Sequence, residues 1–194
     1  FEMSLWLSQI LHGMAMKYAV EHWRRNMPRS MGTLYWQLND CWPVASWASI
    51  DYYGRWKALH YLARAFYAPL LISGLEDPEQ GTVEVHVTSD RRDACRGTVR
   101  WILTGTDGTP LDGGARPVEI APLASARVET LGLAEYLQEH TPRGVLVWLE
   151  LEVEGEIVSS NLVTFARPKH LELCDPNINV RVEMQGDAYR VTLE

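Results

Sequence analysis

Aromatic residues are concentrated in one short stretch of this 194-residue chain. Half of the eight tryptophans lie there, and the stretch contains Tyr35, Trp36, Trp42, Trp47, Tyr52, Tyr53 and Trp56. Such rings can stack on the apolar C–H face of a sugar, whose hydroxyls then hydrogen-bond to polar neighbours such as Gln37, Asn39 and Asp40. The competing interpretation for most of these rings is packing between a helix and a strand, because aromatic residues usually serve protein cores.

The elements that must position these residues follow a helix, strand, helix order. Apolar residues recur at intervals of three and four from Ser4 to Met27, which predicts a long helix capped by Ser4 and ended by Pro28. Met31–Leu38 is typical of a buried parallel strand, and Arg55–Tyr67 of a second helix. Two helices and one strand cannot close an α/β sheet, so we expect that the neighbours of this strand lie upstream and that the chain is cut from a longer one.

After Pro69 the pattern changes to short alternating segments separated by turn signals. The predicted strands are Leu70–Ser73, Gly81–Thr88, Gly97–Gly105, Arg116–Ala121, Ala126–Leu131, Val145–Val153 and Ile157–Phe165, with turns at Asp107-Gly108, Gly113-Gly114 and Glu154-Gly155. About seven strands in this length favour an immunoglobulin-like sandwich, with Gly132–His140 as a short helical crossover. A linker then leads to a hairpin, Ile178–Gln185 and Ala188–Leu193, which we interpret as the start of a truncated second sandwich, since a lone hairpin is not stable in water.

Charge and cysteine usage exclude several classes of protein. The net charge of −7 divides into +3 for residues 1–68 and −10 for residues 69–194, with no basic stripe, so nucleic acid is excluded as a partner. No apolar run is long enough to span a membrane. Cys41, Cys95 and Cys174 are far apart, which argues against a disulfide framework or a zinc site and favours a reducing, cytoplasmic compartment, with a bacterial periplasm or the exterior as alternatives.

Two long segments resemble a known family. The run Met31–Trp47 (MGTLYWQLNDCWPVASW), continued by Ser49–Tyr61 (SIDYYGRWKALHY), closely resembles the end of the catalytic barrel in β-mannosidases of glycoside hydrolase family 2. Asn161–Leu173 (NLVTFARPKHLEL) is similar to the junction between two immunoglobulin-like domains of those enzymes, and the motifs WLSQ at 6–9 and EHWRR at 21–25 are similar to the helix before the last barrel strand. The resemblance covers essentially the whole chain.

The resemblance implies a fold, a domain division and an activity. Residues 1–67 would be the C-terminal portion of a (β/α)8 barrel, residues 68–166 an immunoglobulin-like β-sandwich, and residues 167–194 a linker and the first hairpin of a truncated second sandwich. The family hydrolyses terminal non-reducing β-D-mannosyl residues with retention, using two glutamates that lie on earlier strands. Neither glutamate matches a position here, so we expect the isolated chain to be inactive.

The resemblance also implies one wall of a sugar pocket. Trp36 matches the aromatic residue that lines the subsite of the cleaved mannose, and Asn39, Asp40 and Trp42 are further candidates for substrate binding. Capping of the loop after the strand is the alternative role for Asp40. The implied partners are β-mannoside oligosaccharides or glycan ends and the preceding domains of the same polypeptide. An unpaired strand edge also predicts association between copies, a possible homo-oligomer.

Two alternatives remain for the function. Related family 2 enzymes, exo-β-glucosaminidases or endo-β-mannosidases, share this architecture. A non-catalytic carbohydrate- or protein-binding sandwich is the second alternative; against it, Trp101 and Trp148 occupy positions that we interpret as core. We expect no cofactor and no metal, since His12, His22 and His60 lack a ligand spacing, and Cys41 is interpreted as a small buried hydrophobe.

Overall fold

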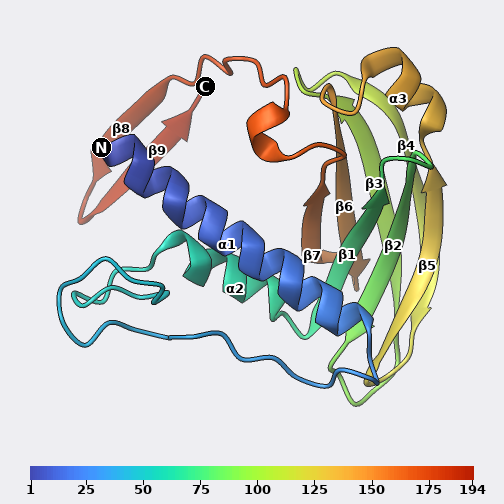
Figure 1. Ribbon diagram of the computed structural model, residues 1–194, viewed down its shortest axis with the longest axis horizontal. Helices are drawn as coiled ribbons and strands as arrows, with labels where there is room; N and C mark the ends of the chain where they lie inside the picture. The colour runs from blue at the N-terminus through green and yellow to red at the C-terminus, as the bar shows by residue number, and fades with distance from the viewer.

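Two helices lie side by side, and the C-terminal part of the longer one reaches the edge of a β-sandwich (Figure 1). The computed structural model describes residues 1–194. Helix α1 spans Glu2–Arg25 and α2 spans Ala58–Phe66, close to the predicted ranges, although the N-cap of α1 is Phe1 and not the predicted Ser4. Val20, Leu59 and Phe66 are buried between the helices. No helix combines the length and the apolar character that a membrane crossing requires.

A glycine brings the two helices into close contact. A Cβ placed on Gly13 of α1 would lie 2.6 Å from Leu62 Cδ1 and 3.4 Å from the Leu59 Cα of α2. The absence of a side chain at this position therefore lets the α2 backbone approach α1.

The sandwich is immunoglobulin-like and antiparallel, as predicted. One sheet has the order β1-β2-β5 and the other β4-β3-β6-β7. The strands are β1 (Leu70–Asp77), β2 (Thr82–Ser89), β3 (Cys95–Gly105), β4 (Pro110–Ile120), β5 (Ala124–Gly132), β6 (Val145–Val153) and β7 (Glu156–Val163). Alternate residues of each strand face inward, so that Ile72, Val85, Leu103 and Leu149 join one core. The predicted crossover is helix α3, Ala134–His140, whose Leu137 belongs to that core.

Two details of the sandwich differ from the prediction. The Gly113-Gly114 pair is not a turn but part of β4, where Gly114 pairs with Trp101 of β3. A Cβ on Gly114 would lie 2.8 Å from Trp101 Nε1, so the indole occupies the space of the missing side chain. Trp148 is not a core residue, because it points to the outer face of β6 with 44% of its surface exposed, and its indole N–H donates to Thr104 Oγ1.

Buried polar residues hold β7 against β1. Ser159 Oγ accepts a hydrogen bond from the Ile72 N–H at 3.0 Å, and Asn161 Nδ2 donates to the Ile72 carbonyl oxygen at 2.9 Å. The backbone N–H and carbonyl groups of Ile72 thus find their hydrogen-bond partners in side chains of the opposite sheet. These bonds close the sandwich at this edge.

The same edge is bonded to α1. Glu21 is 3% exposed, and its Oε1 accepts from Asn161 Nδ2 at 2.8 Å. Lys17 Nζ lies 3.1 Å from Glu21 Oε1 and donates to Asn161 Oδ1 at 2.7 Å. One turn further along α1, Arg25 donates to the Gly74 carbonyl at 3.3 Å. The helix is therefore attached to the sandwich by a connected set of charges and amides.

Arg24 binds at the point where the helical unit, formed by α1 and α2, joins the sandwich. Its Nη1 donates to the carbonyl oxygens of Phe66 at 2.6 Å and Ala68 at 2.9 Å, and its Nη2 to Asp90 Oδ2 at 2.8 Å. Phe66 is the last residue of α2, and Ala68 lies two residues before β1. One guanidinium thus binds the end of a helix, the connection and the loop after β2.

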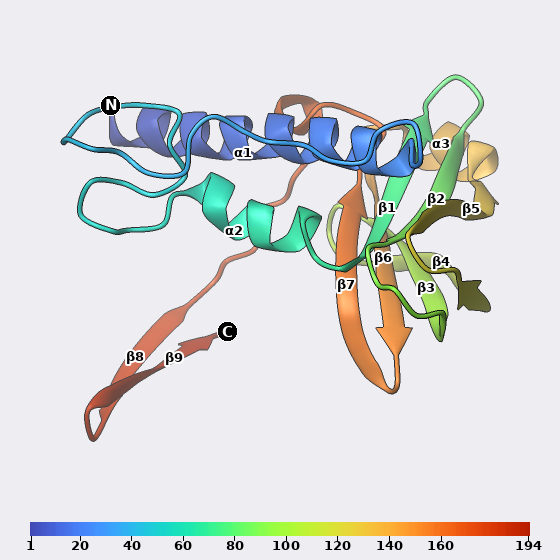
Figure 2. The ribbon, with the colours of Figure 1, turned by 90° about the horizontal axis from the view of Figure 1, so that it is seen from below.

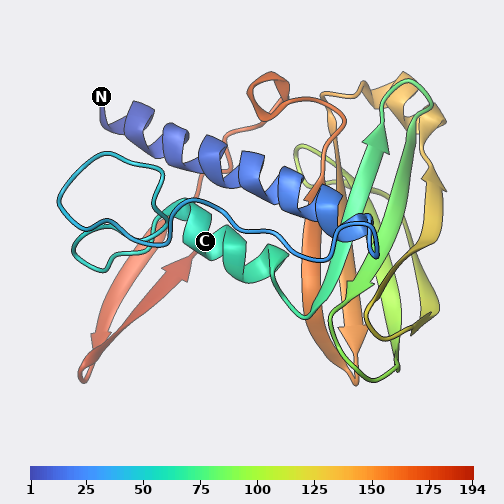
Figure 3. The ribbon, with the colours of Figure 1, turned by 60° about the horizontal axis from the view of Figure 1, so that its bottom comes forward.

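Met31–Leu38 does not form the predicted buried strand. The segment has no strand pairing except near its end, and Leu34 is 99% exposed and Met31 63% exposed. A β-branched and aromatic sequence favours extended backbone, but a strand also needs a neighbouring strand to pair with. No other strand of the described chain runs beside this segment, which follows the outside of α1 and α2 (Figure 3).

The C-terminal hairpin stands apart from the other elements (Figure 2). It consists of β8 (Val180–Gln185) and β9 (Ala188–Leu193), after a single 3₁₀ turn, η1, at Pro168–His170. Its register places Val180 opposite Leu193, Val182 opposite Val191 and Met184 opposite Tyr189. One face is therefore entirely apolar and lies open, with each of these six residues more than half exposed.

Candidate functional site

The aromatic stretch is a loop between α1 and α2 whose base is made by three short backbone segments. Asn39 pairs with Ile50 in parallel, and Ile50 pairs with Trp56 in the antiparallel sense. The N–H of Asp40 donates to the Ile50 carbonyl at 3.0 Å, and the N–H of Lys57 to that of Ser49 at 2.9 Å. The base is thus a small pleated unit directly before α2.

Most aromatic side chains of this loop face solvent. Trp36 is 73% exposed, Trp42 62% and Trp47 58%. Only Tyr35 packs against the buried cluster between the helices. The packing interpretation is therefore wrong for most of these rings, because residues 31–57 pass over the helix pair instead of between its helices. The peptide bond between Trp36 and Gln37 is cis.

Asp40 braces the loop. Its carboxylate is 1% exposed, accepts a hydrogen bond from the Ser46 hydroxyl and lies 2.9 Å from Lys57 Nζ. These bonds, Ser46 first and Lys57 second, hold the pKa of Asp40 below its ordinary value. The geometry agrees with the capping interpretation, since both carboxylate oxygens are engaged within the chain.

The four predicted residues are not all brought together. Asp40 and Trp42 line a hollow of about 440 Å³ with Gln37, Cys41 and Trp47. Trp36 and Asn39 are close in sequence but do not line this hollow. Asn39 is exposed and donates to the carbonyl of Asp40 at 3.2 Å. Cys41 is exposed, so the expectation of a buried thiol is wrong.

A larger hollow lies between the loop and the first half of α1. It measures about 530 Å³, and Gln9, His12, Trp47, Asp51 and Lys57 are among its lining residues. Sequence reasoning missed the α1 contribution, because Gln9 and His12 are more than thirty positions away from the loop residues that line the hollow, which begin at Val44. The spacing of Ser8, Gln9 and His12 along one helix is the only local signal for it.

Sequence reasoning also missed Ser49, which is fully buried. Its Oγ lies 2.9 Å from the Leu38 carbonyl oxygen, 2.9 Å from Tyr35 Oη and 3.0 Å from His60 Nδ1. A small polar residue between Ala48 and Ile50 gives only a weak sequence signal. The contacts connect the segment around Trp36 to α2.

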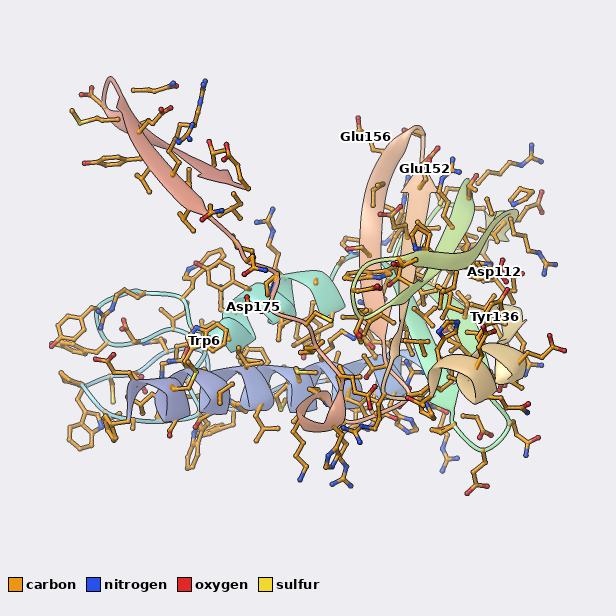
Figure 4. All side chains as sticks on the ribbon, turned by 90° about the horizontal axis from the view of Figure 1, so that it is seen from above. Trp6, Asp112, Tyr136, Glu152, Glu156 and Asp175 are labelled. Carbon is orange, nitrogen blue, oxygen red and sulfur yellow. The ribbon has the colours of Figure 1, made fainter.

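No pair of free carboxyl groups flanks the loop. Desolvation acts to raise the pKa of Asp51, but hydrogen bonds from Arg55 and Tyr53 outweigh it and the net direction is downward. Glu21 is committed to the sandwich edge. Glu152 and Glu156 lie on the β6–β7 hairpin, at the end of the sandwich away from α1 (Figure 4). The chain also brings no three His, Cys, Asp or Glu residues together.

Comparison with known proteins finds one matching family model and several similar enzymes. Residues 81–170 match the family described as "Mannosidase Ig/CBM-like domain". The chain is 30% identical over 201 residues to β-mannosidase A of Aspergillus oryzae and 34% identical over 182 residues to that of Aspergillus terreus. The chain is thus similar to β-mannosidases over most of its own length. These alignments cover 95% and 85% of the chain but only 22% and 19% of the relatives, so the chain spans about a fifth of their length.

A solved structure is similar to the chain over almost the entire length of the chain. The β-D-mannosidase of Dictyoglomus thermophilum superposes with a TM-score of 0.80 at 29% identity, covering 97% of the chain and 23% of that enzyme. The exo-chitosanase of Amycolatopsis orientalis has a TM-score of 0.64 at 24% identity and covers 80% of the chain and 18% of that protein, which shows a shared fold. These proteins are named as β-mannosidases and an exo-chitosanase, and the part of the chain that matches the immunoglobulin-like family model lies mostly in the sandwich.

Proposed function

We propose that the chain is the C-terminal part of a retaining exo-β-mannosidase that hydrolyses terminal non-reducing β-D-mannose residues. In this proposal residues 1–67 complete a (β/α)8 barrel, residues 68–166 support it, and residues 167–194 begin a second sandwich. The observation that carries the proposal is the similarity over almost the entire chain, aromatic loop included, to β-mannosidases.

The surface of the helical unit supports the barrel assignment. The first half of α1 exposes Phe1, Met3, Trp6, Leu7 and Leu11, each by more than half. Monomeric proteins rarely leave contiguous apolar patches of this kind open to water. A barrel that continues over α1 and the Met31–Leu38 segment would cover this surface and would supply strand partners for that segment.

The role proposed for the loop is one wall of the sugar site. Trp36, with most of its ring free, would stack on the apolar face of the mannose. Trp42 would extend the wall at the hollow, and Asn39 would hydrogen-bond to a hydroxyl. Asp40 would act mainly by holding the loop, because Ser46 and Lys57 already bind its carboxylate.

The chemistry requires two carboxyl groups about 5–5.5 Å apart across the glycosidic bond. Asp40 and Asp51 are hydrogen-bonded within the chain and their pKa values are lowered, so neither is suited to donate a proton as a general acid. The acid/base and the nucleophile would come from the preceding part of the polypeptide. The 194-residue chain alone should be inactive.

An aryl β-mannoside assay tests the proposal. We expect no turnover by residues 1–194 and turnover by the full-length polypeptide. Trp36→Ala should lower kcat/KM of the full-length protein by about tenfold or more, which corresponds to about 1.4 kcal/mol of transition-state stabilisation per decade. Trp148→Ala is the matched control, since it removes a partly exposed tryptophan of β6, outside the aromatic loop.

The outcomes separate the alternatives. Cleavage of an aryl β-glucosaminide in preference to the mannoside would assign the chain to a related family 2 enzyme. Full activity of Trp36→Ala together with a lowered melting temperature would make Trp36 a packing residue. Turnover by residues 1–194 alone would refute the assignment of the catalytic carboxylates to the rest of the polypeptide.

A further inference from the structure

One buried hydroxyl contacts both residues that flank the Trp36-Gln37 pair. Ser49 is 0% exposed, and its Oγ meets Tyr35 on one side and Leu38 on the other, each at 2.9 Å. The main chain adds to the same attachment, because the Ser49 N–H lies 3.1 Å from the carbonyl oxygens of both Gln37 and Leu38. The segment that presents Trp36 is therefore fixed at both ends while its indole stays free.

The third contact of Ser49 leads to α2. His60 Nδ1 lies 3.0 Å from Ser49 Oγ, and the His60 ring packs edge-on against Trp56 with the centroids 4.4 Å apart. His60 belongs to a helix whose other side is buried against α1. The attachment of the Trp36 segment is thus set by a rigid element.

Hydrogen-bond stoichiometry assigns the protons in this cluster. A serine hydroxyl has one proton and two acceptor positions. The Leu38 carbonyl can only accept, so it takes the Ser49 proton, and Tyr35 and His60 must both donate to Ser49 Oγ. His60 must therefore carry a proton on Nδ1. The protonated imidazolium also carries this proton, so either charge state preserves the bond.

From this geometry we infer that Ser49, held by His60, is the positioning residue for Trp36. The inference rests on the proposed sugar-stacking role of Trp36. Ser49 does not touch the sugar; it determines where the indole projects by tying Tyr35 and Leu38 to α2. Loss of the hydroxyl would leave two half-buried donors, Tyr35 Oη and His60 Nδ1, without this acceptor, and would leave only the main-chain bonds of Ser49 to hold the segment.

The first test is the tautomer of His60 in the 194-residue chain. Long-range ¹H–¹⁵N NMR spectra above pH 8 should show a protonated Nδ1 and an unprotonated Nε2. This is the less common tautomer, because a free neutral imidazole usually carries its proton on Nε2. Its observation would therefore be informative. A protonated Nε2 with a bare Nδ1 would overturn the inference, since Ser49 would then have to donate to His60 instead of Leu38.

The second test uses two substitutions of one side chain. The amide of His60→Asn places an N–H donor near the position of Nδ1, whereas His60→Gln moves it outward. In the full-length protein, kcat/KM on the aryl β-mannoside should stay within about threefold for His60→Asn and fall roughly ten- to a hundredfold for His60→Gln and Ser49→Ala, the scale of a misplaced substrate contact. Equal effects of Asn and Gln would count against the donor role.

Epistasis distinguishes positioning from general stability. If Ser49 acts through Trp36, Ser49→Ala should change kcat/KM little in a Trp36→Ala background, although it lowers the melting temperature in both backgrounds. An equal loss in both backgrounds would refute the inference. Absence of mannosidase activity in the wild-type protein would instead refute the proposed function, and the His60 tautomer would still decide whether the attachment exists.

Discussion

Asn161 is the residue whose replacement should report most directly on how α1 is attached to the sandwich. Its Nδ2 serves two acceptors, the Ile72 carbonyl at 2.9 Å and Glu21 Oε1 at 2.8 Å, and its Oδ1 accepts from Lys17 at 2.7 Å. The side chain lies at a buried position, 7% exposed. Asn161→Ala removes all three bonds without removing any of the partners.

The expected loss follows from the groups left behind. A buried polar group that loses its partner costs about 1–3 kcal/mol, and two acceptors are affected. Lys17 Nζ remains 3.1 Å from Glu21 Oε1 and compensates part of the loss there, whereas the Ile72 carbonyl has no such substitute. We therefore expect the free energy of unfolding to fall by about 3 kcal/mol.

Urea denaturation followed by far-UV circular dichroism measures this change. Ser160→Ala is the control, because Ser160 is the next residue on β7, is exposed and makes no side-chain hydrogen bond; it should stay within about 0.5 kcal/mol of the wild type. Asn161→Asp should destabilise more than Ala at neutral pH, since it places a carboxylate beside Glu21, and should recover on acidification. An Asn161→Ala variant as stable as the Ser160→Ala control would refute the account of this interface.

Two further predictions concern a glycine and a carboxylate. Gly74→Ala should lower the free energy of unfolding by about 1–3 kcal/mol, because the added methyl group meets the Val163 side chain in the closed sandwich. Gly132→Ala is the control, because the space at its Cβ is open. Equal melting temperatures for the two variants would contradict the packing argument. The folded pKa of Asp40 is lowered, so its stabilising contribution is present above the ordinary carboxyl value of 3.8 and is lost as pH falls through the folded value. Melting temperatures between pH 6 and pH 2.5 should therefore fall more steeply for the wild type than for Asp40→Asn, and parallel curves would argue against this bonding.

The sandwich was predictable because the sequence pattern that marks each strand lies within that strand. Alternation of apolar and polar residues marks each strand, and β6, Val145–Val153, was predicted with its observed bounds. Trp148 shows the limit of the method: it lies in a run of consecutive apolar residues, Val145–Leu149, and only the register with the neighbouring strands and its 44% exposure reveal that it points outward. Where apolar residues occupy both faces of a strand, the sequence alone does not indicate which face is buried.

The candidate site was less predictable because its contacts join distant parts of the chain. Gln9 of α1 accepts a hydrogen bond from the Ala58 N–H across 49 positions, and neither residue has a neighbour in sequence that signals this partner. Ser49 and His60 are closer, but their bond depends on how the loop returns to α2. Met31–Leu38 has a strand-like sequence and no adjacent strand, so local preference alone gave the wrong element there.

The attachment by Arg24 bears on whether the sandwich can be treated as a separable module. Only three residues separate the end of α2 from the start of β1, and this guanidinium holds both sides of the connection together with Asp90. Cleavage between residues 67 and 68 would break the covalent link but leave these bonds, so the two pieces should remain associated as a nicked complex. Recombination of this sandwich onto a foreign helical unit would, for the same reason, require the partner to bring its own equivalents of Arg24 and Glu21.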